Sequence, residues 1–436
     1  MAQFFKAKAK STSIKAIRDA QVLALDHHLN GVVKHQGKTY FVDGVLPGER
    51  VDVLPSAKSG PAKLLKRLND APQRIEPACQ FYQQCGGCSA QYLSAQAQRD
   101  YKLKAVAELI SRQSGYQDLP EFEILSGDDW HYRRATRLST WFDKQRGWQL
   151  GFRQKSSKDI VAISECIVLK PQLSALLVPL QQLLKTWPKS INLGHIELID
   201  CQPQIVCRIR VRNQPSDKIA AQLRSFAQQY SIALVIATDE QSSYLMGEQA
   251  YYDLAEQGLR LAFTPGDFIQ VNEAMNQALV SQALEWLQPC AKDQILDLYA
   301  GIGNFSLALA QNAQQVIAVE GVTAMTKQVL VNAEANGFSN ISAFSGDLEQ
   351  VETAKAWQKT KVNKVLLDPA RAGAKLAISQ VAKLSPSTVV YVSCNPATLA
   401  RDAKVLKQAG YRLSKIALVD MFAHTEHVET MALFER

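Results

Sequence analysis

Apolar and polar positions alternate over short segments near the start of the chain. Turn signals such as Asn30-Gly31, Asp43-Gly44 and Pro47-Gly48 separate these segments. Short alternating segments bounded by such dipeptides are typical of β-strands. Closely spaced strands of this kind predict a small β-barrel. The predicted strands are residues 14–17, 21–24, 31–35, 38–42 and 50–54.

The pattern changes along the chain. Residues 93–115 have helical spacing and end at a glycine, and residues 170–260 read as mixed helix and strand without recognisable chemistry. From residue 294 onward, wholly apolar runs alternate with helical segments. Such alternation predicts a doubly wound parallel sheet of the Rossmann-like kind.

With 436 residues, the chain is longer than one typical domain. We expect an α/β multidomain protein in three parts. These are an OB-like barrel over residues 10–70, a central α+β domain over residues 71–265 and the doubly wound domain over residues 266–436. The longest apolar stretches, such as 232–237, are too short to span a bilayer, and the first residues lack the apolar core of a secretion signal. We therefore expect a cytoplasmic protein.

Positive charge gathers in two segments. The net charge of the chain is +8. Residues 1–70 hold twelve Lys and Arg against six Asp and Glu, and residues 131–158 hold eight against one. The second segment interleaves its cations with aromatic side chains, which can stack on unpaired bases while the cations bind phosphates. The segments predict a polyanion partner, although solvated basic surface, or an amphipathic β-hairpin in the second case, remains an alternative. The aromatic residues are Trp130, Tyr132, Trp141, Trp148 and Phe152.

Eight cysteines in a chain this long do not make a disulfide scaffold, and three of them are closely spaced. Cys79, Cys85 and Cys88 enclose Gly86-Gly87, which lets the backbone fold tightly around one centre. Cys166 is the best candidate for a fourth ligand. Zinc and an iron–sulfur cluster both accept four thiolates, and a compact triplet with a distant fourth cysteine favours the cluster. The three cysteines expected to be buried thiols are Cys201, Cys207 and Cys290.

The ends of the predicted parallel strands carry polar residues, where ligands of such sheets gather. Residues 294–304 form a strand followed by a glycine-rich loop, and the next strand ends in Glu320, an acid suited to ribose hydroxyls. Asp347 and Asp368 end two further strands, with surface acids as the alternative. The dinucleotide fingerprint fails because Ser306 replaces its third glycine, which disfavours a dehydrogenase.

Another strand of this half, residues 388–393, runs into Ser393-Cys394-Asn395-Pro396. Cys394 therefore stands where a nucleophile would stand. A structural buried cysteine is the alternative, because free cysteines are among the most buried residues.

Four motifs of this half resemble the uracil-C5 RNA methyltransferase family: DLYAGIGNF, VLLDPAR, SCNPATLARD and HTEHVETMALF. The phrase GKTYFVDGVLPGERV resembles the TRAM domain, an OB-like barrel of RNA-modifying enzymes. With the cysteine triplet, the resemblance covers most of the chain and favours a member that acts on 23S ribosomal RNA. Ala300 departs from the family, which often has Cys or Ser there.

The resemblance implies S-adenosylmethionine as the methyl donor and a [4Fe–4S] cluster on Cys79, Cys85, Cys88 and Cys166. It implies Cys394 as the nucleophile and Glu429 as the general base, although Glu429 alone would read as an exposed strand residue. The implied cofactor contacts are Gln270, Tyr299, Asn304, Glu320, Asp347 and Asp368.

The implied chemistry needs these residue types. Uracil C5 is a poor nucleophile until a thiolate adds to C6, and a base must then remove the C5 proton. The uridine must leave its stack to reach both groups. We expect a monomer that binds a looped or single-stranded rRNA segment. A transfer RNA methyltransferase and a non-catalytic RNA-binding iron–sulfur protein are the alternatives.

Overall fold

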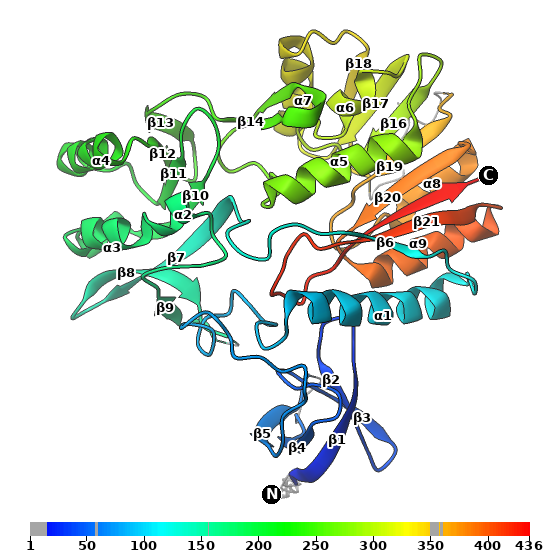
Figure 1. Cartoon of the computed structure of the whole chain (residues 1–436). Helices are drawn as coiled ribbons and strands as arrows, with labels where there is room; N and C mark the ends of the chain where they lie inside the picture. The colour runs from blue at the N-terminus through cyan, green and yellow to red at the C-terminus, as the bar shows by residue number, and fades with distance from the viewer. Residues whose placement is uncertain (1–14, 57–59, 156, 349–356, 358–360) are drawn as a thin grey trace, which may run out of the picture. The chain divides into compact units, whose positions relative to one another are not determined.

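The computed structural model describes residues 15–56, 60–155, 157–348, 357 and 361–436, so residues 10–14 of the expected barrel lie outside the description. The chain divides into two compact units (Figure 1). One consists of Met1–Pro77 and Ala90–Ala105, and the other of Ala78–Ser89 and Val106–Arg436.

The first unit contains a five-stranded antiparallel sheet in the order β3-β2-β1-β4-β5. The sheet curls, because Val42 at the end of β3 forms a bridge with Ala62 just before β5. Inward-facing residues of alternating strands, including Val22 and Val33, form its core. The predicted segments 14–17 and 21–24 contribute to one long strand, and the last strand was not predicted. The strands are β1 Ile17–Leu25, β2 Gly31–His35, β3 Lys38–Val42, β4 Arg50–Leu54 and β5 Lys63–Arg67.

The helix predicted over residues 93–115 is α1, Ala95–Ser114, which is followed by Gly115 at a positive φ of 86°. In the second unit, a seven-stranded sheet has the order β13-β12-β11-β10-β7-β8-β9. Helices α3 and α4 pack on one face of this sheet and bury its apolar side chains. The strands are β7 Ala135–Asp143, β8 Gly147–Arg153, β9 Ile160–Ala162, β10 Leu193–Ile199, β11 Val206–Val211, β12 Ala233–Ala237 and β13 Ser242–Met246. The helices are α2 Pro171–Ser174, α3 Leu177–Lys185, η1 Lys189–Ile191 and α4 Asp217–Tyr230.

The second sheet of this unit has eight strands in the order β18-β17-β16-β19-β20-β22-β21-β6. Its first five strands are parallel, as predicted, and β22 and β21 continue it in antiparallel fashion. The edge strand β6, Phe122–Leu125, comes from far earlier in the chain and pairs in parallel with β21. The other strands are β16 Gln294–Leu298, β17 Gln315–Glu320, β18 Ile341–Ser345, β19 Lys364–Leu367, β20 Thr388–Ser393, β21 Arg412–Val419 and β22 Glu429–Glu435.

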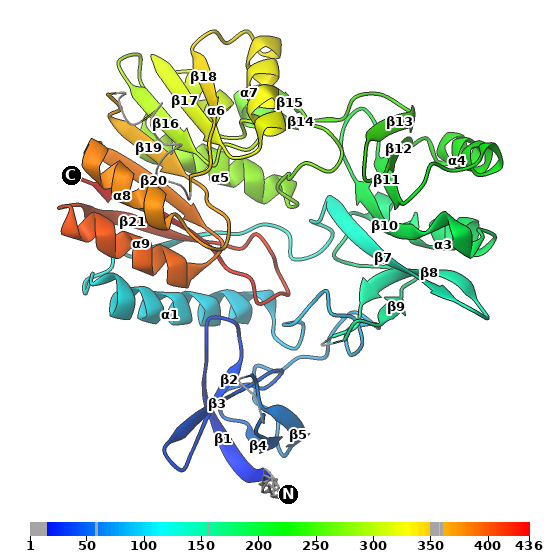
Figure 2. The same ribbon diagram turned by 180° about the vertical axis from the view of Figure 1, so that it is seen from behind.

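Helices cover both faces of this sheet, with α5 in front in Figure 1 and α8 and α9 in front in the reversed view of Figure 2. Strand order reverses at β16, whose neighbours β17 and β19 lie on opposite sides, and ligands of such sheets bind at this point. No helix in the described ranges is long and apolar enough to cross a membrane. The remaining elements are β14 Tyr251–Leu254, η2 Ala255–Gln257, β15 Leu259–Ala262, α5 Glu273–Leu287, α6 Ser306–Ala310, α7 Thr323–Ala335, α8 Lys375–Leu384 and α9 Pro396–Gln408.

Candidate active site

The loop after β16 is held against the end of β17. Tyr299, Gly301 and Gly303 all have positive φ, at 65°, 58° and 98°. A Cβ atom on Gly303 would come within 2.5 Å of the Leu307 side chain, so the loop requires glycine there. The Gly301 amide donates a hydrogen bond of 3.0 Å to the Glu320 carboxylate. This contact brings together two predicted cofactor-binding elements at the point where strand order reverses.

Asn304 and Gln270 are each fixed by buried partners. The Tyr252 hydroxyl donates to Asn304 Oδ1 at 2.9 Å, and Asn276 exchanges two side-chain hydrogen bonds with the same amide. Arg134 is 1% exposed, and its Nε donates to the Gln270 carbonyl at 2.8 Å. Its guanidinium also lies 4.5 Å above the Tyr252 ring. Arg134 therefore joins the segment that carries Gln270 to the tyrosine that holds Asn304, a link that sequence reasoning missed.

Besides Glu320 on β17, acids lie at or near the ends of three other parallel strands, and their environments differ. Asp297, near the end of β16, is fully buried and accepts a hydrogen bond from the Ser306 hydroxyl. Burial raises the pKa of Asp297 to about 7 and that of Asp368, after β19, also to about 7. Asp347 follows β18 and is exposed, directly before residues outside the described ranges. Asp297 was missed, although it stands within the quoted motif.

Cys394 and Glu429 stand at the facing ends of two neighbouring strands. β20 and β22 are antiparallel, and Ser393 pairs with Thr430, so the next position on β20 lies opposite the first residue of β22. Glu429 is only 4% exposed, which excludes the exposed-strand alternative. Burial and the charge of Asp368 raise the pKa of Glu429 well above its usual range.

The Cys394 thiol is half-buried among charged groups. Burial raises its pKa to about 11, Glu429 and Asp368 add to the rise, and Arg371 opposes it. Arg371 Nη2 lies 3.3 Å from a ring nitrogen of His427, and its carbonyl accepts a hydrogen bond of 3.1 Å from the Asn395 side chain. Arg371 was also missed, although its place three residues after Asp368 in VLLDPAR was a usable signal.

The four predicted metal-binding cysteines are all half-buried. Burial is the main cause that raises the pKa values of Cys85 and Cys166, and the charge of Cys79 raises both further, so these three thiols lie near one another. The Gly87 amide donates to Cys85 Sγ at 3.4 Å, and backbone amides also donate to the Cys166 sulfur. Thiols with amide donors suit thiolate ligands of a metal centre. Nevertheless, the described ranges contain no group of three His, Cys, Asp or Glu side chains placed to hold a metal ion.

The cysteine loop packs against the segment that leads into Glu429. The Ser89 amide donates to the His424 carbonyl at 3.0 Å, and the Tyr132 hydroxyl donates to the Ala423 carbonyl at 2.9 Å. The rings of Trp130 and His424 stack with their centroids 3.7 Å apart. The loop of the predicted metal site thus contacts the segment that precedes β22.

Residues 131–158 contain the β7–β8 hairpin, which agrees with the alternative of an amphipathic β-hairpin. Trp148 and Tyr132 are buried, so these two rings are not available for stacking on bases. Along a strand, every second side chain faces the helices, and Trp148 lies on that side. Trp141 lies on the other side and is 52% exposed.

The remaining cysteines differ in exposure. Cys207 is buried and Cys201 is half-buried, whereas Cys290 is exposed. The expectation of a buried thiol was wrong for Cys290, which lies in the short connection between α5 and β16.

Residues 95–436 match the sequence model of a family described as tRNA (Uracil-5-)-methyltransferase. The chain belongs to this family. A protein of Shewanella piezotolerans named 23S rRNA (uracil(1939)-C(5))-methyltransferase RlmD is 44% identical, over all of this chain and 99% of the relative. A protein of the same name from Pectobacterium atrosepticum is 43% identical, over all of this chain and 98% of the relative.

The fold is also that of a solved structure. The tRNA (uracil-54, C5)-methyltransferase of Pyrococcus abyssi, in complex with S-adenosyl-L-homocysteine, superposes with a TM-score of 0.73 at 22% identity. The superposition covers 95% of this chain and all of the other. At this identity the likeness concerns the fold, and it extends over nearly the whole chain.

Proposed function

We propose that the chain transfers a methyl group from S-adenosylmethionine to C5 of a uridine in 23S ribosomal RNA. The observation that carries the proposal is the placement of Cys394 opposite Glu429, at the same edge of the sheet as the glycine loop after β16 and two strands away from it. Full-length relatives at 43–44% identity bear the name of this activity. Covalent addition of a thiol to the pyrimidine is typical of the family.

We assign different parts of the cofactor to different polar residues of the chain. We assign the ribose hydroxyls to Glu320, because this carboxylate is anchored at the end of β17. Tyr299 and Asn304 lie in the loop after β16, and the Gln270 carbonyl is linked to Asn304 through Arg134 and Tyr252. Asp347 and Asp368 complete the proposed set. When bound, S-adenosylmethionine supplies an electrophilic methyl group.

The reaction on the base begins with the Cys394 sulfur, which adds to C6 of the uracil and makes C5 nucleophilic. Arg371 favours the thiolate, whereas the neighbouring carboxyl groups disfavour it. After C5 has taken the methyl group, Glu429 removes the C5 proton, and the C6–sulfur bond breaks to release the product. Because Cys394 and Glu429 lie on adjacent strand ends, the uridine must be flipped out of its stack to reach them.

We also propose that Cys79, Cys85, Cys88 and Cys166 hold a [4Fe–4S] cluster. The amide donors to two of these sulfurs and the proximity of three thiols support it. The cluster would supply a rigid four-thiolate crosslink between the cysteine loop and Cys166. Anaerobically purified protein should carry about four irons per chain. One zinc without inorganic sulfide would contradict the cluster.

The proposed organisation keeps three parts: a TRAM-type RNA-binding barrel over residues 10–70, a central iron–sulfur domain with a basic RNA-binding surface over residues 71–265, and the methyltransferase domain over residues 266–436. The curled five-stranded sheet supports the first part and the β16 switch point the third. The proposed protein is a cytoplasmic monomer, because its substrate is ribosomal RNA and a single chain carries both Cys394 and Glu429.

The deciding experiment is methyl transfer from labelled S-adenosylmethionine to unmodified 23S rRNA, followed by mapping of the labelled nucleotide. A single 5-methyluridine in 23S rRNA is the expected product. Labelling of transfer RNA instead would support the alternative substrate. Binding of both RNA and cofactor without any methyl transfer would support the non-catalytic alternative.

A further inference from the structure

The two faces of the seven-stranded sheet differ. Helices α3 and α4 pack on one face, whereas on the other face only part of the sheet, including Val206 and Val235, is buried in a second apolar core. On β7, Leu138 points into the core that α3 and α4 cover, whereas Arg137 and Trp141 point the other way. The same alternation on β8 and β10 exposes Arg153 and turns His195 toward the open side. We call this side the open face.

Neighbouring strands place these side chains in rows. Glu197 on β10 pairs with Arg137 on β7, and His195 pairs with Ser139. Gly151 on β8 lies opposite Ser139 on the other side. The row between Arg137 and Trp141 therefore has two small residues, Ser139 and Gly151, beside His195, and the surface is low at these two positions. The distance along β7 from Arg137 to Trp141 is about 13 Å, a span of several stacked bases.

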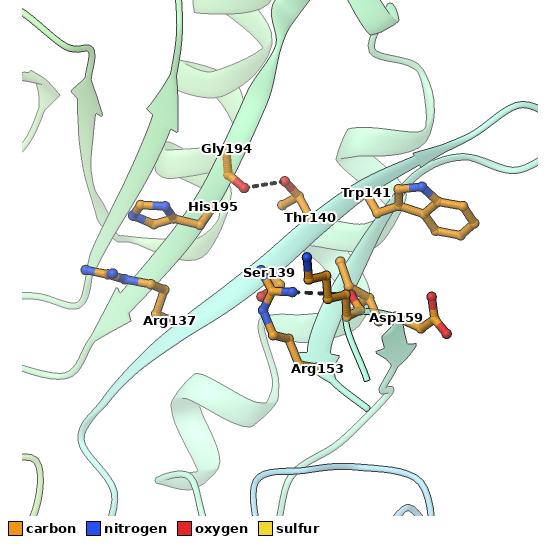
Figure 3. Close-up of a pocket in the computed structure, with 10 residues that line it drawn as sticks. Arg137, Ser139, Thr140, Trp141, Arg153, Asp159, Gly194 and His195 are labelled. Carbon is orange, nitrogen blue, oxygen red and sulfur yellow. Dashed lines mark hydrogen bonds between the residues drawn. The ribbon is translucent and has the colours of Figure 1, made fainter. Parts of the chain in front are cut away.

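A cavity of about 620 Å³ lies on this face (Figure 3). Arg137, Arg153 and Lys158 line it against a single acid, Asp159. In the view of Figure 3, Arg153 lies between Arg137 at one end and Trp141 at the other. A second cavity, of about 710 Å³, shares Arg137 and Arg153 and extends toward Gly86 and Gly87 of the cysteine loop.

The arginine at the end of this cavity is held in place by an acid. Arg137 Nη2 lies 2.6 Å from Glu197, and Arg208 Nη1 lies 2.7 Å from the other oxygen of the same carboxylate. Burial alone would raise the pKa of Glu197, but Arg208 and Arg137 outweigh it and lower the pKa. Arg137 remains 64% exposed, so it is oriented without being removed from solvent.

Resting on the proposed function, we infer that the open face binds a single-stranded segment of the substrate RNA outside the target uridine. The segment's phosphates contact Arg137, Arg153 and Lys158, and one of its bases stacks on Trp141. Cations beside an accessible aromatic face match unpaired RNA, because bases in a duplex do not offer their faces. The occupant is thus an unpaired part of the RNA rather than a protein, since the lining is cationic and polar apart from the indole.

The test uses the full-length protein and fluorescein-labelled twelve-nucleotide oligouridine, with a labelled RNA duplex of equal length for comparison. Trp141→Ala should weaken oligouridine binding about tenfold, and Trp141→Phe should restore most of it, because base stacking contributes about 1–3 kcal/mol. Arg153→Ala should reduce the slope of log K against log salt by about one. The matched control is Arg224→Ala, an exposed arginine on α4 behind the same sheet, which should bind as the wild type does.

The outcomes separate this inference from the proposed function. Wild-type affinity in Trp141→Ala, with methyl transfer to 23S rRNA intact, would overturn the inference and leave the function standing. A different result would be weaker oligouridine binding by Trp141→Ala together with no methylation of 23S rRNA by the wild-type protein. That result would support RNA binding by the open face and contradict the proposed function. Equal weakening for duplex and single strand would overturn the choice of unpaired RNA. Unchanged affinity for S-adenosylmethionine shows that each variant is folded.

Discussion

The two sheets of the second unit offer polar sites of opposite kinds. At the carboxyl ends of β19 and β20 and the amino end of β22, acids and a thiol lie together, and burial raises the pKa values of Asp368, Glu429 and Cys394. On the open face of β7, β8 and β10, cations such as Arg137 stand in solvent beside Trp141. The first site has groups whose protonation the protein controls, and the second has charges that water screens.

This difference separates chemistry from recognition. Each buried catalytic group acts in one particular step of the reaction. A single substitution of such a group should therefore remove a large part of the rate of methyl transfer. Exposed cations each contribute a little to affinity and act together. The expected effects of substitutions therefore fall in size from the buried site to the open face.

The largest effect should come from Cys394→Ala. The addition to C6 has no other nucleophile, so methyl transfer should fall by about 10⁴-fold or more while S-adenosylmethionine still binds. Single-turnover transfer and equilibrium cofactor binding measure the two quantities. Cys290→Ala, at an exposed cysteine far along the chain from the reacting strand, is the control and should keep full activity. Residual turnover near the wild-type rate would remove Cys394 from the mechanism.

Glu429→Gln should block a later step. The amide keeps the shape of the side chain and loses its basicity, so turnover should fall by about 10²–10⁴-fold. Because addition and methyl transfer precede this step, a methylated RNA–protein adduct should accumulate and survive denaturing electrophoresis. The double variant with Cys394→Ala should give no adduct. Normal turnover of Glu429→Gln would move the search for the base to Glu426, His424 and His427.

Arg134 joins the two regions, because it precedes β7 and hydrogen bonds to the Gln270 carbonyl. Arg134→Ala should raise KM for S-adenosylmethionine roughly tenfold, since a hydrogen bond from a charged donor contributes about 1.5–3 kcal/mol. The kcat value at saturating cofactor should change less, and Arg134→Lys should recover part of the KM. A fall in kcat as large as the rise in KM would instead indicate general damage to the fold.

Asp368→Asn tests whether the charge of Asp368 affects the pKa of the Cys394 thiol. Burial and Glu429 raise the pKa of Cys394 most, and the charge of Asp368 raises it further, so removal of that charge should lower this pKa from about 11. Between about pH 7, where Asp368 ionises, and pH 10, alkylation of the Cys394 peptide by iodoacetamide should then be several-fold faster, as followed by mass spectrometry. Asp347→Asn, at an exposed acid after β18, should leave the alkylation profile unchanged. A slower reaction in Asp368→Asn would reverse the assigned sign.

Local sequence patterns were sufficient to predict the parallel strands of the eight-stranded sheet. Apolar runs that end in Glu320, Asp368 and Cys394 identified β17, β19 and β20, because strand ends carry the polar residues in such folds. The predicted strands of the barrel were also largely found, since alternation and turn dipeptides are local signals.

The rest depends on contacts between distant parts of the sequence. β6 joins the sheet beside β21, about three hundred residues later, and no local pattern specifies that partner. The burial of Glu429 and Arg134 likewise follows from what packs around them, and charged residues are ordinarily exposed. The open face forms only because β7 pairs with β10, and no local pattern in the sequence predicts that pairing.

The contact between the cysteine loop and the segment before Glu429 also has a consequence for biosynthesis. The loop ends at Ser89, whose amide bonds to the carbonyl of His424, twelve residues from the last residue of the chain. During translation, the cysteine loop and Cys166 leave the ribosome long before that partner exists. The predicted metal site therefore lacks this packing partner until residue 424 has been made, more than 250 residues after Cys166. A nascent chain cut before residue 420 would present its thiols without this cover, exposed to oxidation and to competing metals.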